Sequence, residues 1–341
     1  MILLLSKTWR RGTGLLIGCL FLAAAFFFNL WLGSTRLPSD SVWKALFAYD
    51  SSAMDQMIIR TTRLPRAVIA LLVGAALAVA GTLTQALTRN PLASPSLLGI
   101  NSGAVFFIVA ALNMGNVKSM NLLIWVAFFG SAVSAAAVFG LGSLGRDGLT
   151  PVKIVLGGTA ISALFSSFTQ GMLVLNEAGL QDVLFWLSGS IAGRELEQLK
   201  IVLPYLLLGL TAAQLLAGPI NILISGEDIA KGLGQNTMAV KLICAVVIVA
   251  LAGSSVSVAG AIGFVGLVMP HMARFLVGTD YRWVIPYSAL LGAILVLLAD
   301  VAVRYVIMPG EVPIGIMTAL IGAPFFVYTA KKELHFKEGG S

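Results

Sequence analysis

Three arginines in the stretch RTTRLPRAV form the first group of residues with a recognisable chemistry. Arg63 and Arg66 are three positions apart, so they share one face if the stretch is helical, and Pro65 is tolerated in a first helical turn. Exposed guanidiniums bind a partner's carboxylates well, because each donates hydrogen bonds in a planar fork. The same side chains also suit lipid phosphates at the end of a membrane span. Protein docking and lipid contact are both open interpretations.

A second polar cluster is the segment 224–236, ISGEDIAKGLGQN, which separates two long apolar runs. Ser225 is suited to cap a short helix that has two acidic residues in its first turn. Gly232 or Gly234 would end that helix. A short capped helix outside the bilayer can be the contact for a soluble motor protein, and an ordinary polar loop is the alternative.

The remaining ionisable residues indicate what the chain lacks. Asp300 and Arg304 are four apart and can pair on one helical face, and Glu311 opens the last apolar run. No ionisable residue lies in the middle of an apolar run, whereas proton- or sodium-coupled carriers usually need such groups. Cys19 and Cys244 are far from any CxxC spacing, so no metal site is predicted.

Catalytic and nucleotide-binding motifs are also missing from the sequence. It contains no GxxxxGK[ST] phosphate loop and no HExxH, Ser/Lys or Asp/Asp set within the apolar runs. We therefore expect a protein that is not an enzyme and binds no cofactor itself. If ATP drives it, the nucleotide and its Mg²⁺ are bound by another chain.

The elements that position these residues are apolar helices. The 341 residues are 58% hydrophobic and 11% charged, against about 25% charged in soluble domains. We expect an all-α polytopic membrane protein, with residues 1–341 forming one transmembrane domain. The eighth run is short and contains Pro270, so a re-entrant segment and nine spans are the alternative. The ten candidate spans are 15–32, 67–87, 97–114, 121–143, 154–175, 201–223, 240–258, 261–275, 284–302 and 312–330.

The net charge of +7 does not indicate nucleic-acid binding. The basic residues are scattered at the ends of apolar runs and form no patch interleaved with aromatic residues. Membrane topology explains them better, and a weak excess of basic residues on one side predicts that both termini are cytoplasmic.

Several long motifs resemble one family. The chain is similar, over nearly its whole length, to the permease subunits of ATP-binding-cassette importers for iron-siderophores, haem and vitamin B12, the FecCD type. The motifs that carry the resemblance are RLPR at 63–66, RNPLASPSLLGINSGA at 89–104, SGEDIAKGLG at 225–234, GFVGLVMPHMARFLVGTDYRWVIPYSALLGA at 263–293, AD followed by Arg at 299–304, and EVPIGIMTALIGAPFF at 311–326.

The resemblance implies a fold and a set of partners. The fold would be that of a type II importer permease, similar to the vitamin B12 importer, with about ten helices in a bacterial cell membrane. The partners would be a dimer of ATP-binding-cassette ATPases, an external substrate-binding protein and a second permease subunit, either identical or homologous. Transport of an iron(III)-siderophore, such as a hydroxamate, is the expected function, and vitamin B12 or haem is the alternative cargo.

The resemblance also assigns roles to individual residues. Arg63, Arg66 and Arg304 would dock acidic residues of the binding protein. Thr150 and Pro151, between the fourth and fifth spans, would lie at the cytoplasmic gate. The cytoplasmic coupling segment at 224–236 would contact the ATPase through Gly226, Glu227, Asp228, Ala230, Lys231, Gly232, Leu233 and Gly234.

Overall fold

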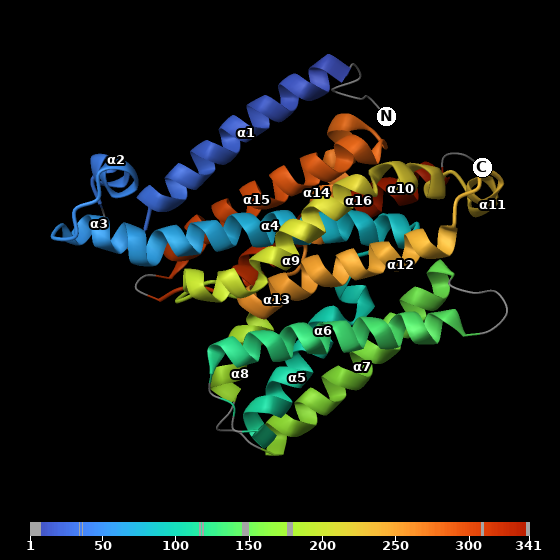
Figure 1. Cartoon of the computed structure of the whole chain (residues 1–341), viewed down its shortest axis with the longest axis horizontal. Helices are drawn as coiled ribbons and strands as arrows, with labels where there is room; N and C mark the ends of the chain where they lie inside the picture. Colours follow the sequence, from blue (N-terminus) through green and yellow to red (C-terminus); the bar gives the residue numbers. More distant parts are fainter. Residues whose placement is uncertain are drawn as a thin grey trace.

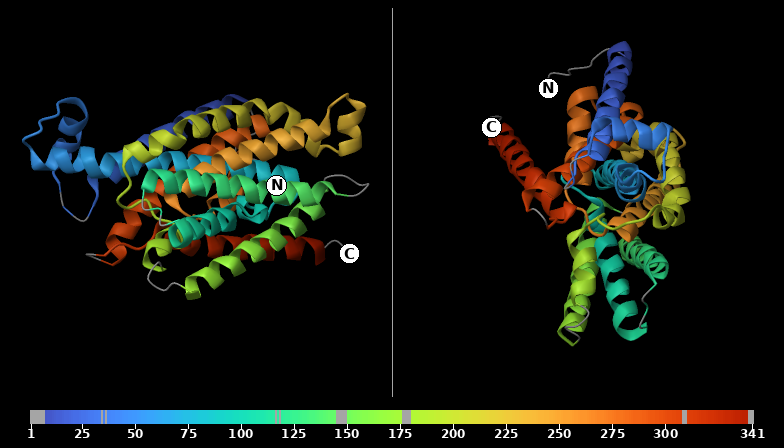
Figure 2. Two further views of the ribbon diagram at one scale, coloured as in Figure 1. Left: turned by 60° about the horizontal axis from the view of Figure 1, so that its bottom comes forward. Right: turned by 90° about the vertical axis from the view of Figure 1, so that its left-hand side faces the viewer.

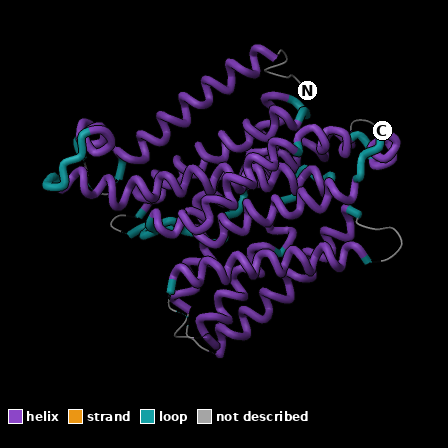
Figure 3. The backbone as a smooth tube through the Cα atoms, in the orientation of Figure 1, coloured by secondary structure: helices purple, strands orange, loops and turns teal. Residues whose placement is uncertain are grey.

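The described part of the chain is built of helices. The computed structural model describes residues 8–33, 35, 37–115, 117, 119–144, 150–175, 180–307 and 310–338, and these contain no strand (Figures 1 and 3). The long helices are α1 (Thr8–Trp31), α4 (Leu64–Thr88), α5 (Ile100–Gly115), α6 (Met120–Ser143), α7 (Pro151–Leu175), α9 (Leu196–Leu215), α12 (Thr237–Ile248), α14 (Val265–Val277), α15 (Tyr281–Val306) and α16 (Ile314–Glu338). The short ones are α2 (Ser39–Phe47), α3 (Met54–Ile58), α8 (Leu180–Ser188), α10 (Ala217–Ile224), α11 (Glu227–Gly232) and α13 (Ser254–Ala259).

These helices match the ten expected spans. Within the described residues, seven helical runs are long and apolar enough to cross a membrane, and three shorter apolar helices accompany them. Two spans are interrupted. A π-turn at Val249–Gly253 joins α12 to α13, and α9 passes into α10 at Leu216. The all-α, multi-span prediction is therefore confirmed.

Helix α4 is the centre of the larger helix group (Figure 1). In the most apolar 18-residue stretch of the run Met54–Thr88, 83% of the residues are buried, compared with 17% in the corresponding stretches of α1 and of α7. Glycines permit this burial. A Cβ at Gly74 would lie 2.3 Å from the Gly292 carbonyl oxygen of α15, and one at Gly81 would lie 1.9 Å from that of Gly266 in α14. Small residues let helix backbones approach this closely in lipid.

Helices α5, α6 and α7 form a second group beside α13 (Figures 1 and 2). The short 3₁₀ turn Pro95–Leu98 lies where the two groups meet. A Cβ at Gly158 of α7 would lie 1.7 Å from the Leu97 carbonyl oxygen, so α7 packs directly on this turn. Ser134 of α6 holds this 3₁₀ turn in place, because its hydroxyl donates to the Gly99 carbonyl at 2.7 Å.

The eighth expected span is a short helix that follows an extended segment. Gly260 and Phe264 have φ angles of 71° and 65°, which end α13 and begin α14. Positive φ at a bulky residue is unfavourable and must be held by packing. Phe264 packs against Gly322 of α16, where a Cβ would lie 2.4 Å from the Phe264 Cβ and 2.6 Å from its ring. The 13 residues of α14 span about 20 Å, less than the ~30 Å of hydrocarbon.

The bundle has two distinct ends. The first carries α2, α3, the end of α15 and the start of α16, and we call it the α2 end. The second carries α11, the start of α1, the end of α6, the start of α7 and the end of α16, and we call it the α11 end (Figures 1 and 2). The candidate site residues divide between these two ends.

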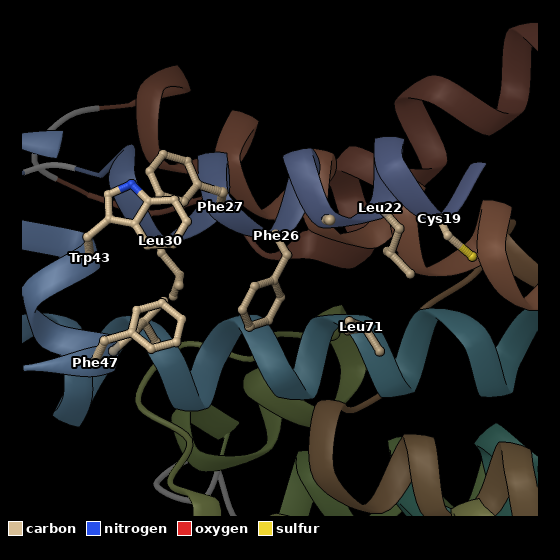
Figure 4. Close-up of a pocket in the computed structure, with 10 residues that line it drawn as sticks. Cys19, Leu22, Phe26, Phe27, Leu30, Trp43, Phe47 and Leu71 are labelled. Carbon is tan, nitrogen blue, oxygen red and sulfur yellow. The ribbon is translucent and has the colours of Figure 1, made fainter. Parts of the chain in front are cut away.

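An apolar groove of about 570 Å³ runs between α1, α2 and α4. Phe26 of α1 projects across it to α4 and Leu22 lies opposite Leu71, whereas Leu30 lies beside Trp43 and Phe47 of α2 at the α2 end (Figure 4). Cys19 lies at the opposite end of the groove. Its lining is almost entirely apolar, as expected for a surface that faces the membrane interior.

Candidate functional site

Arg63 of the α2 end is buried against the end of α1. It lies in the π-turn Ile59–Arg63 that precedes α4, and it is 5% exposed. Its guanidinium donates to the carbonyl oxygens of Leu30 at 2.9 Å and Thr35 at 2.5 Å, and also to that of Trp31. A cation at this position neutralises the negative end of the α1 dipole. Arg63 therefore fastens α1 to α4.

Arg66 joins α4 to α15 and to the segment before α16. Its Nε donates to Asp300 Oδ1 at 2.7 Å, and its Nη1 donates to both carboxylate oxygens of Glu311, at 2.9 and 2.7 Å. The side chain of Asp300 is fully buried, that of Arg66 is 9% exposed, and that of Glu311 is 35% exposed. Glu311 is thus the carboxylate of this group that water reaches.

Arg304 completes the group from the last turn of α15. It donates to the carbonyl oxygens of Asn29 at 3.0 Å and Leu32 at 2.8 Å, and it pairs with Asp300 Oδ2. The Asn29 amide donates to the same Asp300 oxygen at 2.9 Å. Arg304 Nε is buried and makes no hydrogen bond. We call Asn29, Arg63, Arg66, Asp300, Arg304 and Glu311 the arginine cluster.

The arginine cluster corrects one expectation from the sequence. Arg63 and Arg66 were expected to form an exposed pair on one helical face, and both are buried with partners within the chain. The reason is that their partners lie in α1, in α15 and before α16, far away in sequence. The expected pair of Asp300 with Arg304 is confirmed. Glu311 pairs with Arg66 and precedes the helix that it was expected to open.

The arginine cluster carries a net positive charge. Three guanidiniums and two carboxylates leave one positive charge. The exposed Arg60 lies in the same π-turn as Arg63, and the carboxylate of Asp55 in α3 also acts on Arg63. Removing one partner of a buried ion pair costs about 3–5 kcal/mol, because it leaves a buried charge uncompensated. The cluster is therefore a strong clamp on α1, α4 and α15, and its net charge attracts anionic groups.

The polar segment at the α11 end contains the expected short helix. Helix α11 begins at Glu227, after Gly226 with a φ of 139°. Ser225 does not cap it, because its hydroxyl donates to the Asn221 carbonyl of the preceding helix at 3.1 Å. Gly234, at a φ of 79°, ends it: the amides of Gly234 and Gln235 donate to the carbonyls of Lys231 and Ala230, both at 2.9 Å. This is a Schellman ending, which confirms one of the two expected stops.

The exposed face of α11 differs from the face expected. Asp228, Lys231, Gly232 and Gly234 are exposed, but Gly226 is only partly exposed and Ala230 is fully buried. Ile229 and Leu233 are 55% and 69% exposed. Ile229 was missed by the sequence reasoning, although its four-residue spacing from Leu233 was the available signal. Two exposed apolar side chains on a polar segment are typical of a protein contact.

Glu227 is turned towards its own chain. Its carboxylate accepts a hydrogen bond from Lys241 of α12 at 2.9 Å and lies 3.4 Å from Lys231. The hydrogen bond from Lys241, more than the charge of Lys231, lowers the pKa of Glu227 below its usual value. Glu227 therefore fixes the angle between α11 and α12.

Helix α10 connects α11 to the core helices. Asn221 donates to Asp280 Oδ1 at 2.7 Å and accepts from the amide of Tyr281 at 2.9 Å, which ties α10 to the first turn of α15. Arg89, at the end of α4, donates to the Leu223 carbonyl at 3.0 Å. These hydrogen bonds connect α10 to α4 and α15, the two helices that carry Arg66 and Asp300.

Thr150 and Pro151 lie at the α11 end, where α7 begins (Figure 1). Thr150 accepts the Ile154 amide at 3.1 Å, and Lys153 donates to the Leu144 carbonyl at the end of α6, at 3.0 Å. Residues 145–149 of this connection are outside the described residues. The gate assignment of Thr150 and Pro151 stays a prediction.

Helix α7 has an exposed face that carries polar side chains. Thr159, Ala163, Ser167 and Gln170 are exposed and follow one another at helical spacing. Polar side chains are costly against lipid, so such a face is expected to meet protein or water. Helix α7 also exposes Leu156, Leu164 and Phe168 beside these polar side chains, and α1, the other sparsely buried long helix, exposes mainly leucine and phenylalanine.

The sequence and the structure both resemble known transporter subunits. Residues 21–332 match the FecCD transport family. The chain is 52% identical to the "Probable siderophore transport system permease protein YfiZ" of Bacillus subtilis, covering 88% of this chain and 90% of that one. It is 42% identical to that organism's "Iron(3+)-hydroxamate import system permease protein FhuB", covering 96% and 85%.

A solved structure has the same fold. It is described as an inward-facing conformation of a metal-chelate type ABC transporter, and its chain superposes with a TM-score of 0.83 at 31% identity. The match covers 94% of this chain and 99% of the other. The arrangement of helices around α4 is therefore shared with a transporter of known structure.

Proposed function

This chain belongs to the FecCD transport family, and from its site geometry we propose that it carries iron(III)-siderophore complexes inward as the permease of an ATP-driven importer. The division of its polar sites between two ends is the observation that carries the proposal. A net positive, partly water-exposed arginine cluster lies at one end, and a helix with exposed apolar side chains lies at the other. The permease family is not one of enzymes, and ATP hydrolysis belongs to partner chains.

The α11 end is the cytoplasmic end in this proposal, and both termini are cytoplasmic. An ATPase subunit binds the exposed face of α11 through Ile229, Leu233 and Asp228. The contacts of Asn221 and Arg89 then pass its movement to α15 and α4. ATP and Mg²⁺ are bound by an ATPase dimer, and the opening at Thr150 follows the movement of these rigid helices.

The α2 end is the external end, where a binding protein delivers the cargo. Its acidic side chains approach the positive charge of the arginine cluster, which steers docking and fixes orientation more than it adds affinity. Arg66 is the arginine whose partner, Glu311, is itself exposed. Arg63 and Arg304 are buried and do not contact the binding protein directly; they hold α1 and α15 in place.

The translocation path runs along the exposed polar face of α7. A second permease, identical or homologous, covers this face, so that Thr159, Ser167 and Gln170 face the path and not lipid. Hydroxyl and amide groups without charge suit a bulky chelate that has to leave as easily as it enters. The relatives named for siderophore and iron(3+)-hydroxamate transport support a siderophore cargo over vitamin B12 or haem.

Uptake by vesicles tests the energy source. We expect that vesicles containing this chain and its partners take up an iron(III)-hydroxamate when ATP is inside, and that an uncoupler has no effect while ATP is maintained. Uptake that collapses with the uncoupler would identify a proton- or sodium-coupled carrier and reject the proposal. A hydrolysis-deficient variant of the ATPase is the matched control, because it leaves this chain unchanged.

A further inference from the structure

Glu311 is the exposed member of a buried ion cluster, and it covers Arg66. Its two oxygens both accept from Arg66 Nη1, at 2.9 and 2.7 Å, while the Arg66 side chain is only 9% exposed. A carboxylate from outside can meet this edge of Arg66 only where Glu311 now lies. The Nη1 of Arg66 is therefore not open to docking while Glu311 occupies that position.

The other contacts of the arginine cluster are not exchangeable in this way. Asp300 is fully buried and shared by Arg66 and Arg304, and Arg63 is held by three backbone carbonyls. Glu311, by contrast, lies in a short non-helical stretch between α15 and α16. Because Glu311 is 35% exposed, water weakens its pair with Arg66, so an incoming carboxylate can replace it.

We propose that Glu311 holds the place of a binding-protein carboxylate, and that docking displaces it from Arg66. This inference rests on the proposed function, because it needs an acidic partner at the α2 end. The exchange keeps Arg66 paired throughout, so the buried charge is never uncompensated. The surplus positive charge of the arginine cluster favours the arrival of a further carboxylate.

Displacement of Glu311 would directly affect the packing of the first turn of α16. The helix begins at Ile314, three residues after Glu311, and its first turn lies against the backbone of two other segments. A Cβ at Gly315 would lie 2.2 Å from the Ser188 carbonyl oxygen and 3.1 Å from that of Ala261. Releasing Glu311 frees the stretch that leads into this contact. Docking outside thereby loosens the external end of α16.

Docking strength tests the exchange. In nanodiscs that hold this chain with its partner permease and ATPases, Glu311→Gln removes the competing charge and keeps the side-chain shape. We expect the loaded binding protein to dock about two- to fivefold more tightly, the factor that corresponds to a pair of ~0.4–1 kcal/mol. Glu197→Gln is the control, because it removes an acid whose side chain is 69% exposed and pairs with the similarly exposed Lys200.

Thiol labelling tests the release of the segment. Val312→Cys is introduced in a Cys19→Ala background and labelled with a membrane-impermeant reagent. We expect labelling to become several-fold faster when the binding protein docks, and to be fast without it when Glu311→Gln is also present. Normal docking with unchanged affinity in Glu311→Gln and unchanged labelling would overturn the exchange and leave the proposed function standing. Absence of docking by the unmodified transporter would overturn both.

Discussion

Arg66 Nε lies 2.7 Å from Asp300 Oδ1, although 234 positions separate the two residues in sequence. The contact joins the buried helix α4 to α15 at the α2 end of the bundle. Because Arg304 and Asn29 bind the other oxygen of Asp300, one carboxylate holds three helices together.

Asp300→Asn should destabilise the protein strongly. The change leaves two buried guanidiniums sharing a neutral group, and we expect a loss of about 3–5 kcal/mol in the free energy of unfolding. Thermal unfolding of the purified protein in detergent would measure it. Asp40→Asn, which breaks the exposed pair with Lys44, should leave the melting temperature unchanged. Equal melting temperatures for the two variants would show that Asp300 is not a structural counter-ion.

Gly74→Ala should separate α4 from α15. The new methyl group would lie 2.3 Å from the Gly292 carbonyl oxygen, so the helices must move, at a cost of about 1–3 kcal/mol. Gly140→Ala in α6 is the matched control, since no atom lies within 4 Å of its new Cβ. Melting in detergent distinguishes them, and a Gly74→Ala protein as stable as the control contradicts the close contact.

Ile229→Glu should weaken binding of the ATPase without unfolding this chain. The side chain is 55% exposed, so the change costs little stability, but a charge would disrupt an apolar contact. We expect about a tenfold loss in affinity, the size typical of a central contact residue. Copurification and titration of the ATPase measure it. Thr279→Glu adds the same charge to an exposed position at the same end, and an equal loss there would count against a specific role for α11.

Acidification should loosen α11 only below the usual pKa of a glutamate. Lys241 lowers the pKa of Glu227 from 4.5, so the pair contributes stability above about that pH and loses it as pH falls through the lowered pKa. A fluorophore on Leu233→Cys should show constant mobility from pH 7 to 5 and greater mobility below 4.5. Lys241→Met should make the mobility high at every pH; a persistent acid transition in that variant would assign it to another group.

The sequence predicts the spans well because apolar length is a local property. Each expected span corresponds to a helix or an interrupted helix, and polar segments such as 224–236 lie at the ends. The Schellman ending at Gly234 was also predictable, since it depends on one residue that adopts positive φ.

The contacts at the α2 end could not be predicted in the same way. Burial of Arg63 depends on carbonyl groups at the end of α1, and the place of Glu311 depends on how α15 turns into α16. Neither is visible in local spacing. At the α11 end, serine is a favoured capping residue, but the hydroxyl of Ser225 does not cap α11 because it donates to a carbonyl of α10.

The contact of Gly74 with Gly292 has a consequence for genetics. The group that a new methyl at Gly74 would meet is a backbone oxygen, and the reciprocal contact is also with a backbone oxygen, at 2.3 Å. Because neither contact involves a side chain of the facing residue, no smaller side chain at the facing position can relieve it. Suppressors of a defect at Gly74 should therefore arise only at distant sites that stabilise the whole protein, and never as a paired change at Gly292.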